Sequence, residues 1–440
     1  MRARWIVTLA ATTLLAAACG NSEGSGAGNG TTSGNSGSTT DSGTGNVAVN
    51  APGVSDEEIR VTGIVSATNP LGANYASAAD GVNAYFAMVN DAGGVHGRQL
   101  VLADVRDDKV ANNTAEAKGV VDSDEAFAVI PVATLLFTGA DTLVEAGIPT
   151  FGWTINPEWQ GTQDDQKLNL FGQAGSFLCL GCAQPYPPYI AERADRSKVG
   201  LLAYNVPQSS TCLDGWGKSI EKWGAPAGAE VVFSDASLAY GTTDLSVQVQ
   251  KMAEAGVDMV ATCMDNNAIV TLAKEMKKQG LDAIQLLPNA YNQEFFEEFG
   301  DLFEGSYVII GFSPLEAPDD LRPEGLDLYE EWIDSTGGER TENSMVGWLN
   351  AAAFVEGLRE AGPEFTRQKV IDAINSLEDQ NAEGMLPGTN WAEYGHWQRN
   401  PINCSTYLEI VDGKMTPTEQ DSIFTCFDVS GDELEQVDTQ

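Results

Sequence analysis

Apolar and polar residues alternate with two different periods along most of the chain. From residue 57 onward, short β-branched runs such as Ile59–Val65 are followed by longer stretches with apolar residues at helical spacing, such as Tyr75–Asn90. Gly93 and Gly94 mark the end of that stretch. The same pattern predicts strands at residues 100–105, 127–132, 148–153, 198–204, 230–233, 257–262, 284–288 and 306–312. It predicts helices at residues 111–121, 139–146, 213–223, 243–255, 266–279 and 292–299.

Strands separated by helices indicate βαβ units and mainly parallel sheets. The alternation forms two series with a break near residues 171–190, and the chain is longer than a single domain usually is. Three helical segments (321–335, 344–361 and 366–376) and a β-rich tail near 405–411 follow. We therefore expect an α/β fold of two doubly wound parallel-sheet lobes joined by crossing strands. The expected lobes are residues 51–174 with 313–385, and residues 175–312 with 386–440.

The first residues have the three parts of an export signal. Arg2 and Arg4 supply the positive end, Trp5–Leu15 the short apolar stretch, and three alanines the small residues before a cut. The apolar stretch is shorter than the roughly 20 residues that span a bilayer. Because Cys19 follows the alanines directly, residues 1–18 resemble the signal peptide of a bacterial lipoprotein. That resemblance implies a cut before Cys19 and a diacylglycerol on its thiol. The alternative is ordinary secretion, with Cys19 kept as a free or paired thiol.

Residues 20–50 consist almost entirely of Gly, Ser, Thr and Asn. Such a segment buries too little apolar surface to offset the entropy of ordering it, so we expect disorder. As a Gly/Ser-type coil it spans roughly 30 Å r.m.s.. Residues 19–50 are therefore predicted to be a lipidated cysteine followed by a tether that holds the folded part off a membrane.

The net charge of −39 narrows the partners but does not identify the ligand. An acidic surface argues against binding nucleic acid and against adhesion to anionic lipid headgroups. We find no second apolar run long enough to cross a membrane. The expected membrane contact is therefore the lipid anchor alone, and we expect a monomer.

Six cysteines remain when Cys19 is set apart, and an even number in an exported protein suggests three disulfides. We predict a pair in the tail, a pair that follows two strands of one sheet, and a short local pair: Cys404–Cys426, Cys212–Cys263 and Cys179–Cys182. The spacing of the last pair also occurs in redox motifs and zinc sites. With only two histidines in the chain, a structural bond is the better interpretation. We expect neither a metal nor a cofactor.

Several short motifs, in order, carry a resemblance to a known family. Residues 72–98 contain a Gly-bearing loop, a helix that ends in Asn90–Gly94, and a turn that ends in Gly97-Arg98. The later matches are Asp107-Asp108, Ala146–Pro149, Asn156–Glu158, Glu304-Gly305 and Val411–Lys414. In this order the chain resembles the type I solute-binding proteins of ABC importers, the leucine/isoleucine/valine-binding family, over nearly all of residues 57–415. The resemblance implies two lobes that close on a small ligand and a function without catalysis.

The resemblance also implies where the ligand binds. Ligands of open parallel sheets bind beyond the carboxyl ends of the strands, so we selected the loops at 66–74, 106–110, 133–138, 153–159, 205–211, 263–267 and 289–293. In the first lobe, the family's position for binding a carboxylate falls on Ala133 and Thr134, and Trp153 and Thr154 lie on the next loop. In the second lobe, an aromatic residue and an acid hold an ammonium group in amino-acid binders. The full set of candidates is Thr68, Tyr75, Ala133, Thr134, Trp153, Thr154, Tyr204, Asp265 and Tyr291.

Two departures from the family pattern bear on the ligand. Ile155 stands where a threonine usually precedes Asn-Pro, and the loop after the last strand, Pro288–Asn292, contains no acid. For each candidate, a turn or a helix N-cap is the structural alternative. Our main hypothesis is a substrate-binding lipoprotein that captures an amino acid or another small polar solute and delivers it to ABC permease subunits, on the extracytoplasmic face of the cell membrane. The alternative is a ligand-sensing module for a signalling partner. We find no G-x-S-x-G or H-E-x-x-H motif in the folded part, so an enzyme is not expected.

Overall fold

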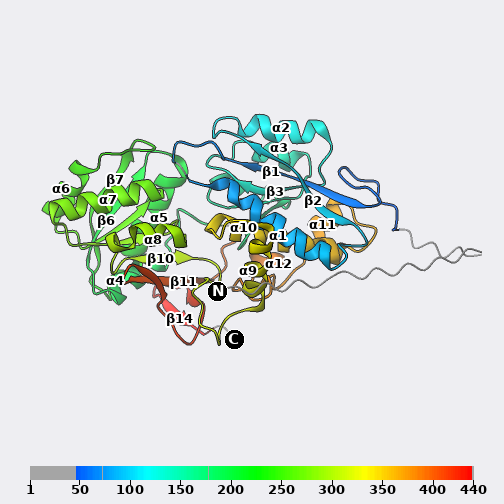
Figure 1. Cartoon of the computed structure of the whole chain (residues 1–440). Coiled ribbons are helices and arrows are strands. Elements are labelled where there is room, and N and C mark those ends of the chain that lie inside the picture. The colour runs from blue at the N-terminus through cyan, green and yellow to red at the C-terminus, as the bar shows by residue number, and fades with distance from the viewer. Residues whose placement is uncertain (1–45, 72, 177, 439–440) are drawn as a thin grey trace, which may run out of the picture. The chain divides into compact units, whose positions relative to one another are not determined.

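A computed structural model describes residues 46–71, 73–176 and 178–438. The predicted signal peptide, Cys19 and nearly all of the predicted tether lie outside the described residues. These described residues belong to one unit by their contacts. Two β-sheets organise this unit, and helices cover both of them (Figure 1).

The first sheet has five parallel strands in the order β2-β1-β3-β4-β5. Its central strand β3 is buried along its whole length, as expected for a strand covered on both faces. The strands are β1 (Glu58–Val65), β2 (Gln99–Asp107), β3 (Ala128–Ala133), β4 (Thr150–Gly152) and β5 (Leu170–Gly172). The intervening helices are η1 (Tyr75–Ser77), α1 (Ala78–Asp91), α2 (Asn113–Ser123), α3 (Ala140–Glu145) and η2 (Pro157–Trp159).

Helices from late in the sequence return to cover this first sheet. They are α9 (Glu324–Thr336), α10 (Glu342–Ala361) and α11 (Arg367–Ile374), and α9 and α10 pack beside α1 (Figure 1). Helix α10 is apolar nearly all round, as a fully buried helix is. Glycines allow α1 and α10 to approach closely, because a Cβ on Gly347 would lie 2.0 Å from the carbonyl oxygen of Ala78.

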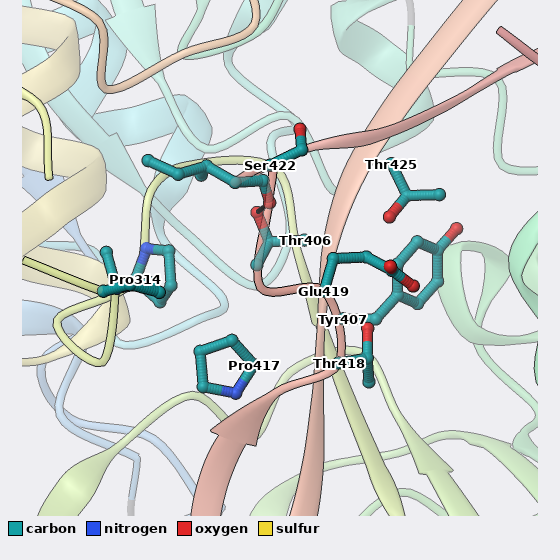
Figure 2. A pocket seen from close by; sticks show the side chains of 11 residues that line it. Pro314, Thr406, Tyr407, Pro417, Thr418, Glu419, Ser422 and Thr425 are labelled. Carbon is teal, nitrogen blue, oxygen red and sulfur yellow. Dashed lines mark hydrogen bonds between the residues drawn. The ribbon is translucent and has the colours of Figure 1, made fainter. Parts of the chain in front are cut away.

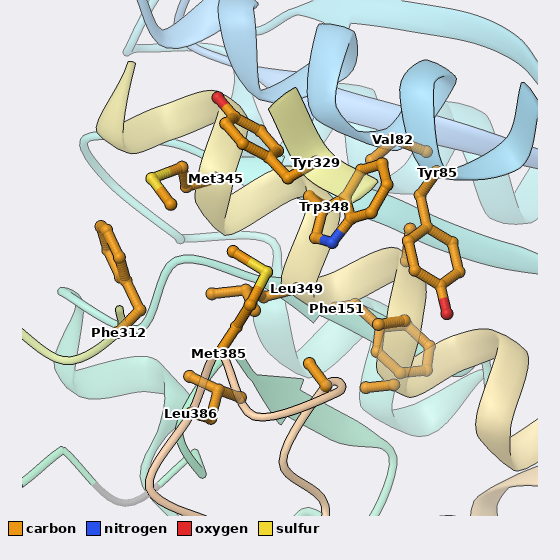
Figure 3. Packing of buried hydrophobic residues seen from close by; sticks show 14 of the residues in the cluster. Val82, Tyr85, Phe151, Phe312, Tyr329, Met345, Trp348, Leu349, Met385 and Leu386 are labelled. Atoms are coloured by element: carbon orange, nitrogen blue, oxygen red, sulfur yellow. The ribbon is translucent and has the colours of Figure 1, made fainter. Parts of the chain in front are cut away.

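Aromatic rings fill the space between these helices. Trp348 of α10 lies between Tyr85 of α1 and Tyr329 of α9, with edge-to-face ring contacts at 4.8 and 5.6 Å (Figure 3). Trp348 is fully buried, and such ring pairs stabilise a core beyond the area that they bury. The late helices therefore belong to the core of the first sheet, although their sequence follows that of the second sheet.

The second sheet is mixed, in the order β14-β13-β11-β10-β9-β8-β6-β7, with β12 paired to β11. Strands β7, β6, β8, β9 and β10 are parallel, whereas the tail strands join as antiparallel neighbours. The strands are β6 (Lys198–Tyr204), β7 (Glu230–Leu238), β8 (Met259–Cys263), β9 (Ile284–Leu287), β10 (Tyr307–Ile310), β11 (Ile402–Val411), β12 (Lys414–Pro417), β13 (Thr425–Asp428) and β14 (Glu435–Val437). Its helices are α4 (Tyr186–Arg193), α5 (Pro207–Trp223), α6 (Ser246–Ala255), α7 (Asn266–Gln279) and α8 (Gln293–Phe299), with η3 (Gly300–Leu302) after α8.

The chain passes between the two sheets after β5, after β10 and before β11. Strands β10 and β11 are antiparallel neighbours, so two of these passages start side by side. The predicted α/β fold with two mainly parallel sheets is confirmed. The exact lobe boundaries stay a prediction.

The structure departs from the predicted elements at several positions. Helix α5 begins at Pro207, six residues before the predicted start at 213. Proline is compatible with the first turn of a helix, because the N–H that it lacks would have no partner within the helix. Strand β7 continues to Leu238, beyond the predicted end at 233. Helix α4, the short helix α12 (Trp391–Tyr394) and the strands β5, β13 and β14 were not predicted.

Among the residues that the structure describes there are three disulfides, and they are the pairs expected from the sequence. Cys212–Cys263 joins α5 to the end of β8, and Cys404–Cys426 joins directly opposite residues of β11 and β13. Cys179–Cys182 closes a short loop before α4.

Candidate functional site

A large cavity lies where loops of the two sheets meet. It has room for about 900 Å³, and its lining comes from loops that follow β1, β3 and β4 of the first sheet and β6, β7, β8 and β9 of the second. These loops leave the carboxyl ends of parallel strands, the edge at which ligands of such sheets bind. The volume lies in the range of pockets that bind drug-sized molecules.

Two hydrogen bonds link the loops of one sheet to those of the other beside this cavity. The Gln208 side-chain amide, on α5, donates to the carbonyl of Leu135 at 3.1 Å. The Asn267 side-chain amide, at the start of α7, donates to the carbonyl of Leu71. Both acceptors and both donors line the cavity, so the structure has the two walls in contact.

The wall from the first sheet is mainly aromatic and aliphatic. The rings of Tyr75 and Trp153 lie 5.6 Å apart and are almost fully buried. Leu71 and Leu135 line the cavity beside them and pack in the same apolar cluster. Burial raises the pKa of the Tyr75 hydroxyl well above its usual range, with Tyr240 and Asp265 as further causes, so this group is a neutral phenol.

The wall from the second sheet combines two tyrosines and a carboxylate. The rings of Tyr204 and Tyr240 are 5.2 Å apart in an edge-to-face arrangement. The Tyr204 hydroxyl donates a hydrogen bond to Asp265, and burial followed by this carboxylate raises the pKa of Tyr204. Asp265 is the N-cap of α7 and accepts from the N–H groups of Asn267 and Ala268. Helix α7 thereby fixes the acid at the cavity wall.

Tyr240 also touches the opposite wall. It packs against the apolar cluster that contains Tyr75 and Trp153, as well as against the second-sheet cluster that contains Tyr204. Its buried hydroxyl has no hydrogen-bond partner among the described residues. Four aromatic rings from two sheets therefore gather at one side of the cavity, next to Asp265.

A second acid lines the cavity at the start of α10. The backbone N–H of Glu342 donates to the carbonyl of Tyr291 at 3.3 Å. Burial raises the pKa of the Glu342 carboxyl to about 8, so it is largely protonated at neutral pH. The Tyr291 hydroxyl is engaged behind the wall, because it donates to Glu316 at 2.9 Å and accepts from the Leu315 N–H.

Six of the nine predicted ligand-binding residues line the cavity: Tyr75, Trp153, Thr154, Tyr204, Asp265 and Tyr291. The structure places the other three outside its lining. Thr68 is exposed, and its N–H donates to the Asp107 carboxylate at 3.0 Å. Ala133 and Thr134 are fully buried, and the Thr134 carbonyl accepts from Asn156.

The loop after β3 turns Leu135, and not Thr134, to the cavity. Strand β3 ends at Ala133, and beyond it Thr134 is fully buried while Leu135 lines the cavity. The Thr134 hydroxyl has no hydrogen-bond partner among the described residues. The role of Thr134 as a ligand donor therefore stays a prediction.

Tyr240 is the main lining residue that the sequence analysis missed. The predicted strand ended at residue 233, and no loop after it was selected. Strand β7 ends at Leu238, which places Tyr240 in the following loop. Only its position after a strand could have indicated Tyr240 as a binding residue. Its residue type could not, because an aromatic residue after a strand is also common in protein cores.

Two other features were tested for a role in binding. A much smaller hollow of about 10 Å³ lies between Pro314, Thr406, Tyr407 and the segment at 417–425 (Figure 2). It has room for about one water molecule and none for a solute. His396 is buried against the rings of Phe171 and Trp391, and burial lowers its pKa to about 4.

Within residues 46–71, 73–176 and 178–438, no group of His, Cys, Asp and Glu is arranged to hold a metal ion. In the same residues, no helix has the length and hydropathy needed to span a membrane.

Comparison with solved structures identifies the same fold. One is described as a branched chain amino acid ABC transporter from Thermus thermophilus with bound valine; it is 19% identical, has a TM-score of 0.66, and the match covers 82% of this chain and 96% of that one. A fatty acid ABC transporter substrate-binding protein from Thermomonospora curvata is 19% identical, with a TM-score of 0.65 and coverage of 86% and 95%. A solute binding protein from R. palustris in complex with benzoate is 15% identical, with a TM-score of 0.65 and coverage of 83% and 97%.

A comparison with curated proteins found no match to this sequence. The family profile described as periplasmic binding protein matches residues 58–414, which include the first sheet, the second sheet from β6 to β11 and the residues that line the cavity. The chain therefore belongs to the periplasmic binding protein family, whose members are binding proteins and not enzymes.

Proposed function

We propose that this protein captures a small organic solute in the cavity between its two sheets and delivers it to the permease of an ABC importer. The observation that carries the proposal is the cavity itself, which is lined from both sheets at the carboxyl ends of their strands. Closure of two lobes around a ligand is a common way for binding proteins to signal occupancy to a partner. The similar proteins from Thermus thermophilus and Thermomonospora curvata are both described as parts of ABC transporters, which supports the same role here.

The predicted ligand class is an amino acid or a similar small polar solute. Structures of similar fold are described with valine, isoleucine and benzoate bound. The space of about 900 Å³ exceeds what a single aliphatic amino acid fills, so it also admits larger solutes.

The proposed location is the extracytoplasmic face of a bacterial membrane. Cys19 would carry the lipid, and residues 20–50 would act as the tether. The strongly acidic chain is repelled by anionic headgroups, so an anchor is a physical means of keeping it near the permease. Labelled palmitate supplied to the growing cells should appear on the wild-type protein and be absent from a Cys19→Ser variant. Equal labelling of both would refute the anchor.

Calorimetry and small-angle scattering on the exported chain test the binding function. A panel of amino acids, amides, organic amines and short carboxylates should include a ligand that binds one to one and reduces the radius of gyration. Failure of every compound to bind or to change the scattering would count against the proposal. Binding without ligand uptake by cells that carry the cognate permease would favour a sensory module instead.

A further inference from the structure

We infer that the ligand is an organic cation, whose positively charged head lies among the rings of Tyr75, Trp153, Tyr204 and Tyr240 and faces the carboxylate of Asp265. This inference rests on the proposed solute-binding function and narrows its ligand class. It differs from an amino acid in a specific respect: the ligand needs a cationic head and no carboxylate beside it.

The ring arrangement is the first argument. Tyr75 and Trp153 form one pair at 5.6 Å, and Tyr204 and Tyr240 form the other at 5.2 Å. Tyr240 packs against the cluster that contains the first pair, so the two pairs adjoin. Aromatic faces attract cations, and cages of several rings are used to recognise quaternary ammonium groups. A neutral phenol keeps this attraction, and burial holds the hydroxyl pKa of Tyr75, Tyr204 and Tyr240 above the usual value.

The charge of the lining is the second argument. Among the cavity-lining residues that the structure describes, four acids other than the largely protonated Glu342 stand against one base: Asp265, Glu294, Glu298 and Glu339 against Arg399. Arg399 is turned to other partners, since its guanidinium donates to the Ala183 carbonyl at 2.6 Å. An acidic, partly enclosed cavity concentrates cations and repels anions.

The absence of the expected carboxylate site is the third argument. In the family pattern, a carboxylate would bind at the loop after β3, and Thr134 was the expected donor. Thr134 is enclosed outside the cavity, and the N–H of Leu135 already donates to the Ser66 hydroxyl at 3.0 Å. On the next loop, the N–H of Trp153 donates to the Val132 carbonyl at 2.9 Å. Leu71, Leu135 and Trp153 present apolar surface at this wall, and Thr154 beside them brings a hydroxyl to the lining.

A matched set of ligands tests the charge directly. Choline, its neutral isostere 3,3-dimethylbutan-1-ol and its zwitterionic relative glycine betaine have similar heads and differ in charge. Phenethylamine and L-phenylalanine form a second comparison, in which the only difference is the added carboxylate of the amino acid. Calorimetry on the exported chain should show at least tenfold tighter binding of choline or phenethylamine than of the matched neutral or zwitterionic compound.

Two variants with matched controls test the residues. Asp265→Asn keeps an effective helix cap while it removes the charge, so it should weaken binding of the amine at least tenfold. Asp244→Asn is its control, because Asp244 accepts a backbone N–H bond from Ser246 and lies outside the cavity lining. Tyr240→Leu should weaken binding of the cation severalfold, and more than Tyr240→Phe, which keeps the ring.

The possible outcomes separate this inference from the proposed function. If amino acids or carboxylates bind and the amines do not, the cation is wrong and solute binding stands. If the amines bind equally well to wild type and Asp265→Asn, the assigned position is wrong. If no compound of the wider panel binds, the proposed function itself fails. Thermal unfolding of each variant, measured without ligand, checks that the change has not merely destabilised the fold.

Discussion

The disulfide between Cys212 and Cys263 allows a quantitative prediction about stability. Its two cysteines are 51 residues apart in sequence, against 3 for the Cys179–Cys182 pair. By the loop-entropy relation, cross-linking the longer loop destabilises the unfolded chain by about 4 kcal/mol, and the shorter loop by about 2 kcal/mol. Replacing both cysteines of a pair by alanine should therefore lower the free energy of unfolding roughly twice as much at the long loop.

Urea unfolding of the two double variants, followed by tryptophan fluorescence and circular dichroism, measures this difference. Trp216 and Trp223 lie on α5 with Cys212 and are two of the chain's nine tryptophans, so the fluorescence includes a contribution from the element that loses its link. The variant without the Cys179–Cys182 pair is the control for loss of a disulfide as such. An equal or larger loss of stability in that control would refute the loop-entropy reasoning.

Two further predictions concern α10. Because burial raises the pKa of Glu342 from 4.5 to about 8, the folded protein holds this proton more tightly than the unfolded chain does, and the carboxyl lowers stability as pH rises between those values. The melting temperature of ligand-free Glu342→Gln should therefore rise relative to that of the wild type as the pH increases from 5 to 8. A difference between the two melting temperatures that stays constant with pH would contradict this. Gly347→Ala should destabilise the protein by about 1–3 kcal/mol, because its Cβ would lie 2.0 Å from the Ala78 carbonyl oxygen. Gly217→Ala, inside α5 and with only an ordinary contact of its Cβ with Leu201 at 3.6 Å, is the control for the change from glycine to alanine within a helix.

The parallel part of the fold could be predicted from the sequence, because the patterns that indicate its strands and helices lie within short segments of the chain. Apolar runs such as residues 198–204 and helical spacing such as 266–279 give β6 and α7 with the same bounds in the structure. Periodicity of this kind depends on burial of one face, and both sheets bury their strands between helices. The tail was not accessible in the same way. Strands β13 and β14 are short, and their pairing with β11 depends on contacts remote in sequence and on the Cys404–Cys426 bond.

The sequence predicted which loops form the site, but it did not predict which side chains of those loops face the cavity. The rule for carboxyl ends of strands selected the loops of Tyr75, Trp153, Tyr204 and Asp265, all of which line the cavity. It gave no information on which face of a loop points inward, so Thr134 was chosen where Leu135 lies. Strand β3 ends at Ala133, and tertiary packing sets which side chain of the following loop faces the cavity.

The acid content of the cavity also depends on tertiary structure. Glu342 is the first residue of α10, and Glu339 lies three residues before it. Helix α10 covers the first sheet and lies far along the chain from the loops that follow the strands of that sheet. Nothing in their local sequence distinguishes them from the many surface acids of a chain with 63 Asp and Glu residues. Only the return of α10 beside α1 brings them to the cavity.

A crystal structure with the tightest-binding compound of the solute panel tests the central claim most directly. The account predicts one ligand molecule in the cavity, in contact with side chains of both walls, including Tyr75 or Trp153 from the first and Tyr204 or Asp265 from the second. A ligand bound outside this cavity, or in contact with only one wall while the other stands away from it, would contradict capture between the two sheets.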